Sequence, residues 1–97
     1  MEKFRVQHDK VGQKFFIDFG DNTEALMAYT EVNNVMDLHH TYVPEEHRSE
    51  GIAEQLAHAA FEFARRNEMK IIPSCPYVRD KFLKQHPEYM DVVTHEF

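Results

Sequence analysis

Alternating hydrophobic and polar residues fill the first half of the chain and predict a series of β-strands. The alternation covers four segments, Lys3–His8, Lys14–Phe19, Glu24–Val32 and Val35–Val43. Successive side chains of a strand point to opposite faces of a sheet, so each segment has one face suited to burial. Gly, Asp and Asn residues, which accept turn geometry, separate the segments. The pattern predicts four consecutive antiparallel strands.

The fourth predicted strand carries two adjacent histidines. Strict alternation places Met36, Leu38, His40 and Tyr42 on one face and Val35, Asp37, His39, Thr41 and Val43 on the other. His39 and His40 therefore fall on opposite faces, and only one of them is expected to face a ligand.

A long amphipathic helix follows these strands. Its apolar residues cover an arc of roughly 200° on a helical wheel, and they are Ile52, Ala53, Leu56, Ala57, Ala59, Ala60, Phe61, Phe63 and Ala64. An arc this wide predicts more than one packing partner. The alanines allow close approach to the sheet. Phe61, nearly opposite Ile52, requires cover from another segment or from a second subunit.

The last third of the chain adds a strand and a second helix. Lys70–Ile72 follows the long helix directly, which predicts a right-handed crossover to a strand parallel to Val35–Val43. Pro73 ends that strand. Pro76 suits the first position of a helix that runs to Gln85, with Cys75 as its N-cap. A short edge strand at Val92–Val93 is also expected. The predicted class is α/β (α+β): a four-stranded antiparallel meander, a crossover helix, a parallel strand and a C-terminal helix.

Composition and charge narrow the classes of function. We expect a single domain over residues 1–97. Eleven Lys and Arg against 17 Asp and Glu give a formal charge of −6, which disfavours nucleic acid and anionic membranes as partners and tolerates an amine. The one cysteine suits a reducing compartment. The sequence shows no signal peptide and no membrane-spanning run, so we expect a cytoplasmic protein.

The stretch Val43–Arg66 joins the fourth strand to the long helix through a polar turn. Backbone amides converge at a helix N-terminus and favour an anion such as a phosphate. Ser49, Glu50 and Gly51 are equally suited to start an ordinary capped helix. The spacing alone leaves both interpretations open.

Residues 48–53, RSEGIA, resemble the acyl-CoA-binding motif Q/R-x-x-G-x-G/A of the GNAT superfamily of N-acyltransferases. Arg48 matches the opening position, Gly51 the first glycine and Ala53 the second small residue. The segments IPSCPYV at 72–78 and KFLKQHPEY at 81–89 resemble a short, single-domain branch of that family. The resemblance covers roughly residues 35–89.

The resemblance implies acetyl-CoA as cofactor. It implies that the backbone of the fourth strand binds the pantetheine arm and that the following turn binds the pyrophosphate. The cofactor-binding residues it indicates are Thr41, Val43, Arg48, Ser49, Glu50, Gly51, Ile52 and Ala53. Small residues at 51 and 53 let the backbone approach a phosphate. The Glu50 side chain is expected to point outward, because its carboxylate repels phosphate.

Cys75 is the first candidate catalytic residue. A lone cysteine is commonly a small buried hydrophobic residue. At a helix N-terminus, however, the helix dipole favours the thiolate. In the short branch that the sequence resembles, this cysteine is the proposed catalytic residue. It is then either a nucleophile that carries the acyl group or an acid and hydrogen-bonding group beside the thioester.

Tyr77 and His40 are further catalytic candidates. Larger family members carry a tyrosine in the last helix that protonates the departing thiolate, whereas this chain has Phe82 and Leu83 there. Tyr77 is a substitute, although a buried structural tyrosine is the alternative. Either His39 or His40 suits a general base, and a solvated histidine is the alternative. The seven histidines form no pair with a third ligand nearby in the sequence, so we expect no metal.

These observations predict transfer of an acetyl group from acetyl-CoA to an amine, such as a protein lysine or an N-terminus. A coenzyme A-binding module without catalysis is the alternative, favoured by the missing late tyrosine and by the lack of the N-terminal helices that wall the acceptor site in the family. A third possibility is an interaction domain, such as a homodimer formed through Phe61.

Overall fold

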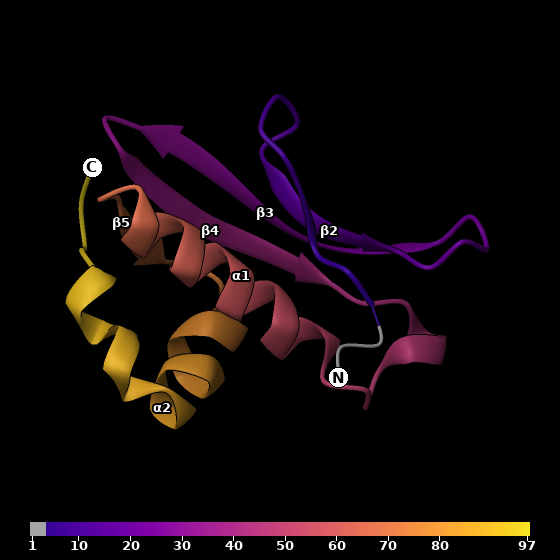
Figure 1. Cartoon of the computed structure of the whole chain (residues 1–97). Coiled ribbons are helices and arrows are strands. Elements are labelled where there is room, and N and C mark those ends of the chain that lie inside the picture. Colours follow the sequence, from indigo (N-terminus) through magenta and orange to yellow (C-terminus); the bar gives the residue numbers. More distant parts are fainter. Residues whose placement is uncertain (1–3) are drawn as a thin grey trace.

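The computed structural model describes residues 4–97 and contains one mixed sheet of five strands with helices packed against it (Figure 1). The strands are β1 (Gln7–Asp9), β2 (Lys14–Asp18), β3 (Glu24–Val32), β4 (Val35–Tyr42) and β5 (Lys70–Pro73). The helical segments are η1 (Glu45–His47), α1 (Ile52–Arg66), η2 (Val78–Phe82), α2 (Leu83–Gln85) and η3 (Pro87–Val92). The strand order follows the chain, from β1 to β5.

The sheet confirms the predicted class and topology. Strands β1 to β4 pair antiparallel, and β5 pairs parallel to β4 through the crossover helix α1. Asn33 and Asn34 join β3 to β4 and have positive φ values of 54° and 64°. A two-residue hairpin turn needs positive φ at both positions to match the twist of its strands. Alternation of buried residues along β3 puts Ala25, Met27 and Tyr29 in the core.

Strand β1 is shorter than its hydrophobic pattern predicts. Only Gln7–Asp9 pairs with β2, although the prediction ran from Lys3 to His8. Lys3 itself lies outside the described residues. Phe4 and Val6 are half-buried against the core without belonging to the ladder. Their alternation with polar residues therefore reflects burial and not strand pairing.

A β-bulge in β4 makes the faces of that strand differ from the predicted alternation. Ala28 pairs with His40 while Tyr29 pairs with Leu38, so His39 is an extra residue without its own partner on β3. An inserted residue reverses the alternation beyond it. Thr41, opposite the buried Met27, consequently lies on the core side.

Helix α1 lies across one face of the sheet and supplies much of the core (Figure 1). Its fully buried residues include Leu56, Ala57, Ala60 and Ala64. Phe61 is 0% exposed. Its ring centroid lies 5.4 Å from that of Phe82 and 5.2 Å from that of Tyr89. The C-terminal segment of the same chain thus covers Phe61, which removes the basis for a dimer or interaction surface there.

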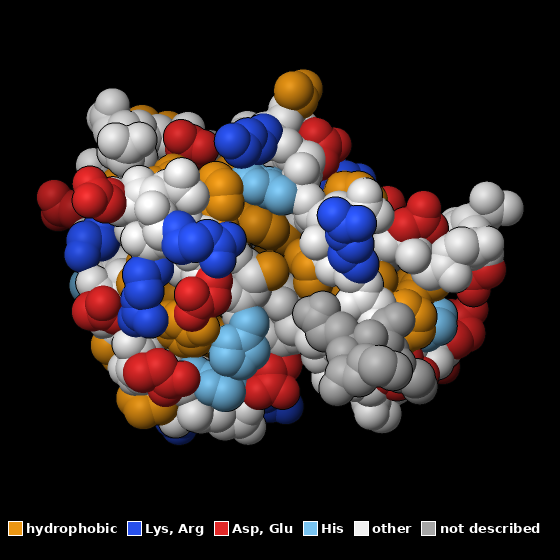
Figure 2. Space-filling view, viewed as in Figure 1, with side chains coloured by type: hydrophobic (Ala, Val, Ile, Leu, Met, Phe, Trp, Pro, Cys, Tyr) orange, Lys and Arg blue, Asp and Glu red, His pale blue; other side chains and the backbone are white. Residues whose placement is uncertain are grey.

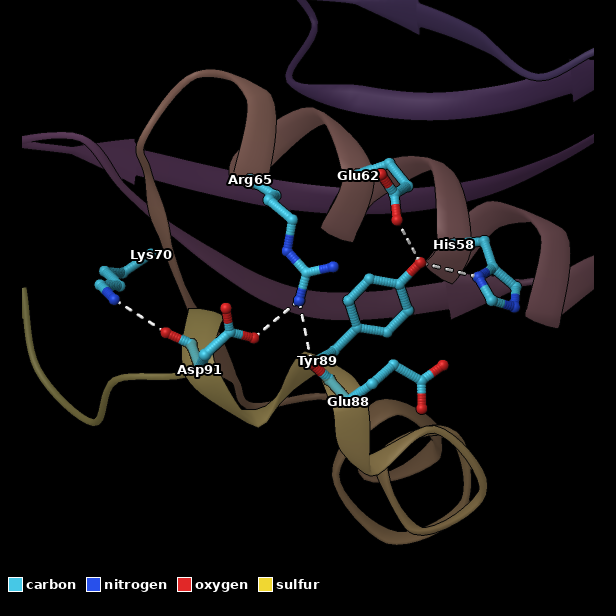
Figure 3. Close-up of polar contacts among 7 residues, drawn as sticks. All are labelled: His58, Glu62, Arg65, Lys70, Glu88, Tyr89 and Asp91. Carbon is cyan, nitrogen blue, oxygen red and sulfur yellow. Dashed lines mark hydrogen bonds and ion pairs between the residues drawn. The ribbon is translucent and has the colours of Figure 1, made fainter.

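The C-terminal segment is a series of short helical turns that packs beside α1. Residues 76–85 are helical as predicted, but the middle of this helix, η2, is a π-helical turn. Arg65 Nη2 of α1 donates to Asp91 Oδ1 at 2.7 Å and to the Glu88 carbonyl at 2.9 Å (Figure 3). In place of an edge strand at Val92–Val93, a single parallel bridge joins Val93 to Ile71.

No helix within residues 4–97 combines the length and the apolar character that crossing a membrane requires.

Candidate functional site

The chain leaves β4 through a compact junction with two left-handed residues. Ser49 has φ 78° and Gly51 has φ 73°, and α1 begins at the next residue, Ile52. Gly51 is the N-cap of α1, and no side chain hydrogen-bonds to the cap. Ser49 therefore does not cap the helix. The first amides of α1 are left for another acceptor, at the positive end of a 15-residue helix.

A cavity of about 490 Å³ opens at this junction. Its walls are Val43, Arg48, Ser49, Gly51, Ala53, Glu54, Tyr77 and Lys81. Arg48 Nε donates to the Val43 carbonyl at 2.9 Å, which holds the guanidinium beside the end of β4. Arg48 and Lys81 bring two positive charges to the wall and Glu54 one negative charge. The balance of side chains and the helix dipole favour an anionic ligand.

The pairing of β4 with β5 ends near Cys75 and Thr41, neither of which lines the cavity at α1. The last paired residues of the two strands are Leu38 and Pro73. Beyond this pair, β4 continues to Tyr42, whereas the segment after β5 leads into the helical residues 76–85. Cys75 stays in contact with β4, because its amide donates to the Leu38 carbonyl at 2.8 Å. The Cys75 Sγ lies 3.2 Å from Thr41 Oγ1. The bulge in β4 is what turns Thr41 toward this thiol.

Cys75 precedes the helical residues 76–85, as predicted. Its carbonyl accepts the Arg79 amide at 3.0 Å, the first bond of that helix, which places Cys75 at the N-cap. The cysteine is 5% exposed. The residue is therefore almost closed to solvent, and it does not line the cavity at α1.

Tyr77 lines the cavity and is half-buried. Burial raises the pKa of Tyr77 above its ordinary value of 10.0, and the negative charge of Glu54 adds to the shift. The phenol is protonated at neutral pH. Its chemistry at this site is that of a proton donor.

The structure does not bring His40 to this site. His40 pairs with Ala28, on the face of the sheet away from Met27 and Thr41. His39 Nε2 lies 3.3 Å from Thr30 Oγ1, on that same outer face. The prediction that the two histidines lie on opposite faces is wrong, because the bulge at His39 interrupts the alternation.

Most of the other predicted residues meet at the cavity. Val43, Arg48, Ser49, Gly51 and Ala53 line it together. The backbone of Ile52 is in the first turn of α1, but its side chain is buried in the core. Glu50 is exposed, and its carboxylate lies 3.2 Å from His47 Nδ1.

Sequence reasoning missed two groups of polar residues. Glu54 and Lys81 line the cavity, although neither belongs to the motif. Glu54, His58 and Glu62 recur at intervals of four residues along one side of α1, which is the signal that identifies a second cluster. His86 joins that cluster from the C-terminal segment, so donor atoms of Glu54, His58 and His86 lie within 4.8 Å of one another. His58 and His86 are far apart in the sequence, so its spacing could not reveal this group, and the expectation of no metal remains a prediction.

Tyr89 links this second cluster to the core. Its hydroxyl donates to Glu62 Oε2 at 2.6 Å and lies 3.1 Å from His58 Nδ1 (Figure 3). Burial, together with the hydrogen bond to Glu62, raises the pKa of Tyr89 to about 12. The tyrosine is therefore a neutral hydrogen-bonding partner for His58 at physiological pH.

Comparison with known proteins shows the family and the fold of this chain. A family model described as GCN5-related N-acetyl-transferase matches residues 14–92. Protein NATD1 of Danio rerio is 37% identical over 97 residues, which cover 96% of this chain and 87% of that protein. Protein NATD1 of Homo sapiens is 35% identical over 85 residues, which cover 86% of this chain and 74% of that protein.

A solved structure has the same fold. The NMR solution structure of a GCN5-like protein from Staphylococcus aureus matches with a TM-score of 0.72 and 31% identity, over 100% of this chain and 94% of that one. The family model, the similar sequences and the shared fold show that the chain belongs to the GCN5-related N-acetyltransferase family.

Proposed function

We propose that the protein transfers an acetyl group from acetyl-CoA to an amine. The observation that carries the proposal is the cavity at the N-terminus of α1, where the left-handed residues Ser49 and Gly51 leave backbone amides for an anion beside Arg48 and Lys81. The negative charge of the coenzyme A pyrophosphate is complementary to these amides and to the positive side chains of Arg48 and Lys81. We further propose that the thioester arm extends from this cavity along the end of β4 toward Cys75, which does not itself line the cavity.

When bound, acetyl-CoA supplies a thioester whose carbonyl carbon an amine attacks. The residues of this chain then have three tasks. Backbone groups of Thr41 and Val43 hold the pantetheine arm, and the junction from Arg48 to Ala53 binds the phosphates. Tyr77, which its raised pKa keeps protonated, donates a proton to the departing thiolate. Holding both reactants in place supplies most of the rate enhancement.

Cys75 assists the transfer or carries the acetyl group. As a nucleophile, its sulfur forms a thioester with the acetyl carbon while the bond from that carbon to the coenzyme A sulfur breaks, and the amine then displaces the cysteine. In the assisting role, Cys75 and Thr41 only orient the thioester through their polar contact. Mass spectrometry of the quenched protein distinguishes these roles, because only the first adds an acetyl group to Cys75.

The test is release of free coenzyme A from acetyl-CoA in the presence of lysine peptides and small amines, measured by chromatography. We expect turnover by the wild type. We expect a loss of about 10²-fold or more in Cys75→Ala and in Tyr77→Phe, the usual scale for removing a proton donor. Tyr42→Phe is the matched control, because Tyr42 is 45% exposed on the outer side of the sheet. Equal turnover in wild type, Cys75→Ala and Tyr77→Phe contradicts the assigned roles.

The burial of Cys75, which is 5% exposed, favours a second candidate, a coenzyme A-binding module without catalysis. Thermal stabilisation by acetyl-CoA together with no release of coenzyme A supports this candidate. Absence of stabilisation and of turnover contradicts both. The formal charge of −6 is compatible with a basic acceptor in the catalytic case.

A further inference from the structure

A second set of polar side chains lies between α1 and the C-terminal helical turns, where Figure 2 shows histidine and carboxylate side chains gathered at the surface. Glu54 and His58 come from α1, and His86 comes from the residue that follows α2. Their donor atoms all lie within 4.8 Å of one another. The rings of His58 and His86 are 4.5 Å apart between centroids and nearly perpendicular, at 71°.

The hydrogen bonds around His58 fix which ring nitrogen is available. The Tyr89 hydroxyl donates its proton to Glu62 Oε2 at 2.6 Å. It therefore accepts from His58 Nδ1 at 3.1 Å, and that nitrogen carries the hydrogen (Figure 3). His58 Nε2 keeps its lone pair. A histidine held by such a partner on one nitrogen is oriented to bind a metal ion through the other.

His86 faces carboxylates through both ring nitrogens. Its Nδ1 lies 3.5 Å from Glu88 Oε2, and its Nε2 lies 2.7 Å from Glu54 Oε2. The shorter contact is a hydrogen bond in which Nε2–H donates to Glu54 Oε2. When an ion binds at Nε2, the ring hydrogen moves to Nδ1, where the Glu88 carboxylate lies 3.5 Å away, and the Glu54 oxygen moves aside to admit the ion.

We propose that His58 Nε2, His86 Nε2 and the Glu54 carboxylate bind a divalent transition-metal ion of the Zn²⁺ type. Two imidazole nitrogens and one carboxylate suit zinc, whereas magnesium and calcium prefer oxygen ligands alone. Tetrahedral binding requires donor atoms about 3.3 Å apart, at bond lengths near 2.0 Å. The Glu54 side chain is 43% exposed and is free to make that small adjustment.

The site leaves one coordination position to solvent or a ligand. His58 also lines a separate cavity of about 530 Å³, together with Arg5, Val6, Gln55, Ala59 and Glu62. Three protein ligands with an open fourth position characterise exchangeable or catalytic zinc sites. The bound ion ties α1 to the residue before Pro87 and thereby stabilises the packing of the C-terminal segment. Because Glu54 also lines the proposed cofactor cavity, the test reads metal binding directly and not acetyl transfer.

The experiment is calorimetric titration of the metal-free full chain with ZnCl₂, repeated with CoCl₂ under visible absorption spectroscopy. We expect one ion per chain and a Co²⁺ spectrum typical of nitrogen and oxygen ligands without a thiolate band. Glu54→Gln and His86→Gln, which keep the side-chain size, are each expected to weaken binding at least tenfold. Tyr89→Phe is expected to weaken it by 10- to 100-fold through loss of the partner of His58.

Matched controls are Glu50→Gln, at an exposed carboxylate beside His47, and His39→Gln, on the outer face of the sheet. Both are expected to bind zinc as the wild type does. Circular dichroism establishes that each variant is folded. Absence of zinc binding by the wild type overturns the proposal, as does binding that Glu54→Gln and His86→Gln leave unchanged.

Discussion

The extra residue His39 decides which side chains of β4 face Cys75. Without it, strict alternation places Thr41 on the outer face of the sheet, whereas Leu38 is on the buried face. With the bulge, Thr41 lies beside Met27 and its hydroxyl reaches Cys75 Sγ at 3.2 Å. One inserted residue thus moves a hydroxyl to the candidate site and moves His40 away from it.

We predict that Thr41→Val lowers acetyl transfer through Cys75. The substitution keeps the shape of the side chain and removes its hydroxyl contact with the thiol. A double-mutant cycle measures the coupling: the loss caused by Thr41→Val in the wild type is expected to disappear in Cys75→Ala. Thr30→Val, at an exposed residue of the outer face, is the control. Equal losses in both backgrounds contradict a role through Cys75.

His8 predicts a dependence of stability on pH. Its ring stacks on Phe15 with centroids 4.1 Å apart, and its Nε2 lies 2.6 Å from the Tyr29 hydroxyl. Burial, followed by the charge of Lys10, lowers the pKa of His8 below its ordinary value of 6.5, against weaker opposite effects of Asp9 and Glu31. The unfolded chain then binds the proton more readily than the folded one. Stability contributed by His8 is present above pH 6.5 and is lost as pH falls toward the lower folded pKa.

The measurement for His8 is urea unfolding at about pH 7 and about pH 5. His8→Phe preserves ring stacking and removes the titrating group, so its free energy of unfolding is expected to fall less between the two pH values than that of the wild type. His39→Gln, at an exposed histidine, is expected to follow the wild type. If the free energy of unfolding falls as steeply in His8→Phe as in the wild type, another group causes the pH dependence and the prediction is contradicted.

At the scale of elements, the connection from β4 to α1 positions the candidate site. Strand β4 ends at Tyr42, a single 3₁₀ turn follows, and left-handed residues at Ser49 and Gly51 turn the chain into α1. Gly51 is the N-cap and no side chain caps α1, so the first amides of the helix have no side-chain acceptor. The junction is thus shaped by backbone conformation more than by side-chain contacts.

We predict that Gly51→Ala and Gly20→Ala cost similar stability and differ in ligand binding. Both glycines have positive φ, 73° and 83°, and a Cβ at either one meets no atom within 4 Å. Each substitution therefore costs roughly 1–2 kcal/mol from backbone strain alone. Only Gly51 lines the cavity at α1, so only Gly51→Ala is expected to weaken acetyl-CoA binding in calorimetry. Equal acetyl-CoA affinity in the two variants argues against phosphate binding at this turn.

The sequence predicts most elements because their signals are local. Strand β3 has the predicted bounds, Glu24–Val32, and the parallel strand β5 begins at the predicted Lys70. The bulge at His39 was not predictable, since it has no turn residue to mark it and depends on how β3 and β4 fit together. The π-helical turn of η2 likewise depends on packing. Glu54 and His86 are 32 residues apart, so only the folded chain brings them together.

At the scale of the whole molecule, the C-terminal segment completes the core that the sheet and α1 begin. Phe61, Phe82 and Tyr89 form one aromatic cluster, with centroid separations of 5.2–5.8 Å. Lys70 Nζ and Arg65 Nη2 add bonds to Asp91 at the surface. The wide apolar arc of α1 is thereby buried on two sides, by the sheet and by residues that follow β5.

We predict that Phe61→Ala destabilises the protein by about 3–5 kcal/mol, because it leaves a cavity in this cluster. That loss is a large part of the 5–15 kcal/mol typical of a small domain. Urea unfolding monitored by circular dichroism measures it. Met90→Ala is the control, since Met90 is 52% exposed, and its effect is expected to stay within about 0.5 kcal/mol. A small effect of Phe61→Ala contradicts the role of the C-terminal segment in the core.

Acetyl-CoA binding between β4 and α1 is tested most directly by nuclear magnetic resonance of the ¹⁵N-labelled chain. Acetyl-CoA is added to the protein while each backbone amide is followed separately. The amides of Ser49, Gly51 and Ala53 are expected to shift first and furthest, with those of Val43 and Cys75 following as the thioester arm binds. Absence of shifts at millimolar acetyl-CoA, or shifts confined to the outer face of the sheet, contradicts the proposed function.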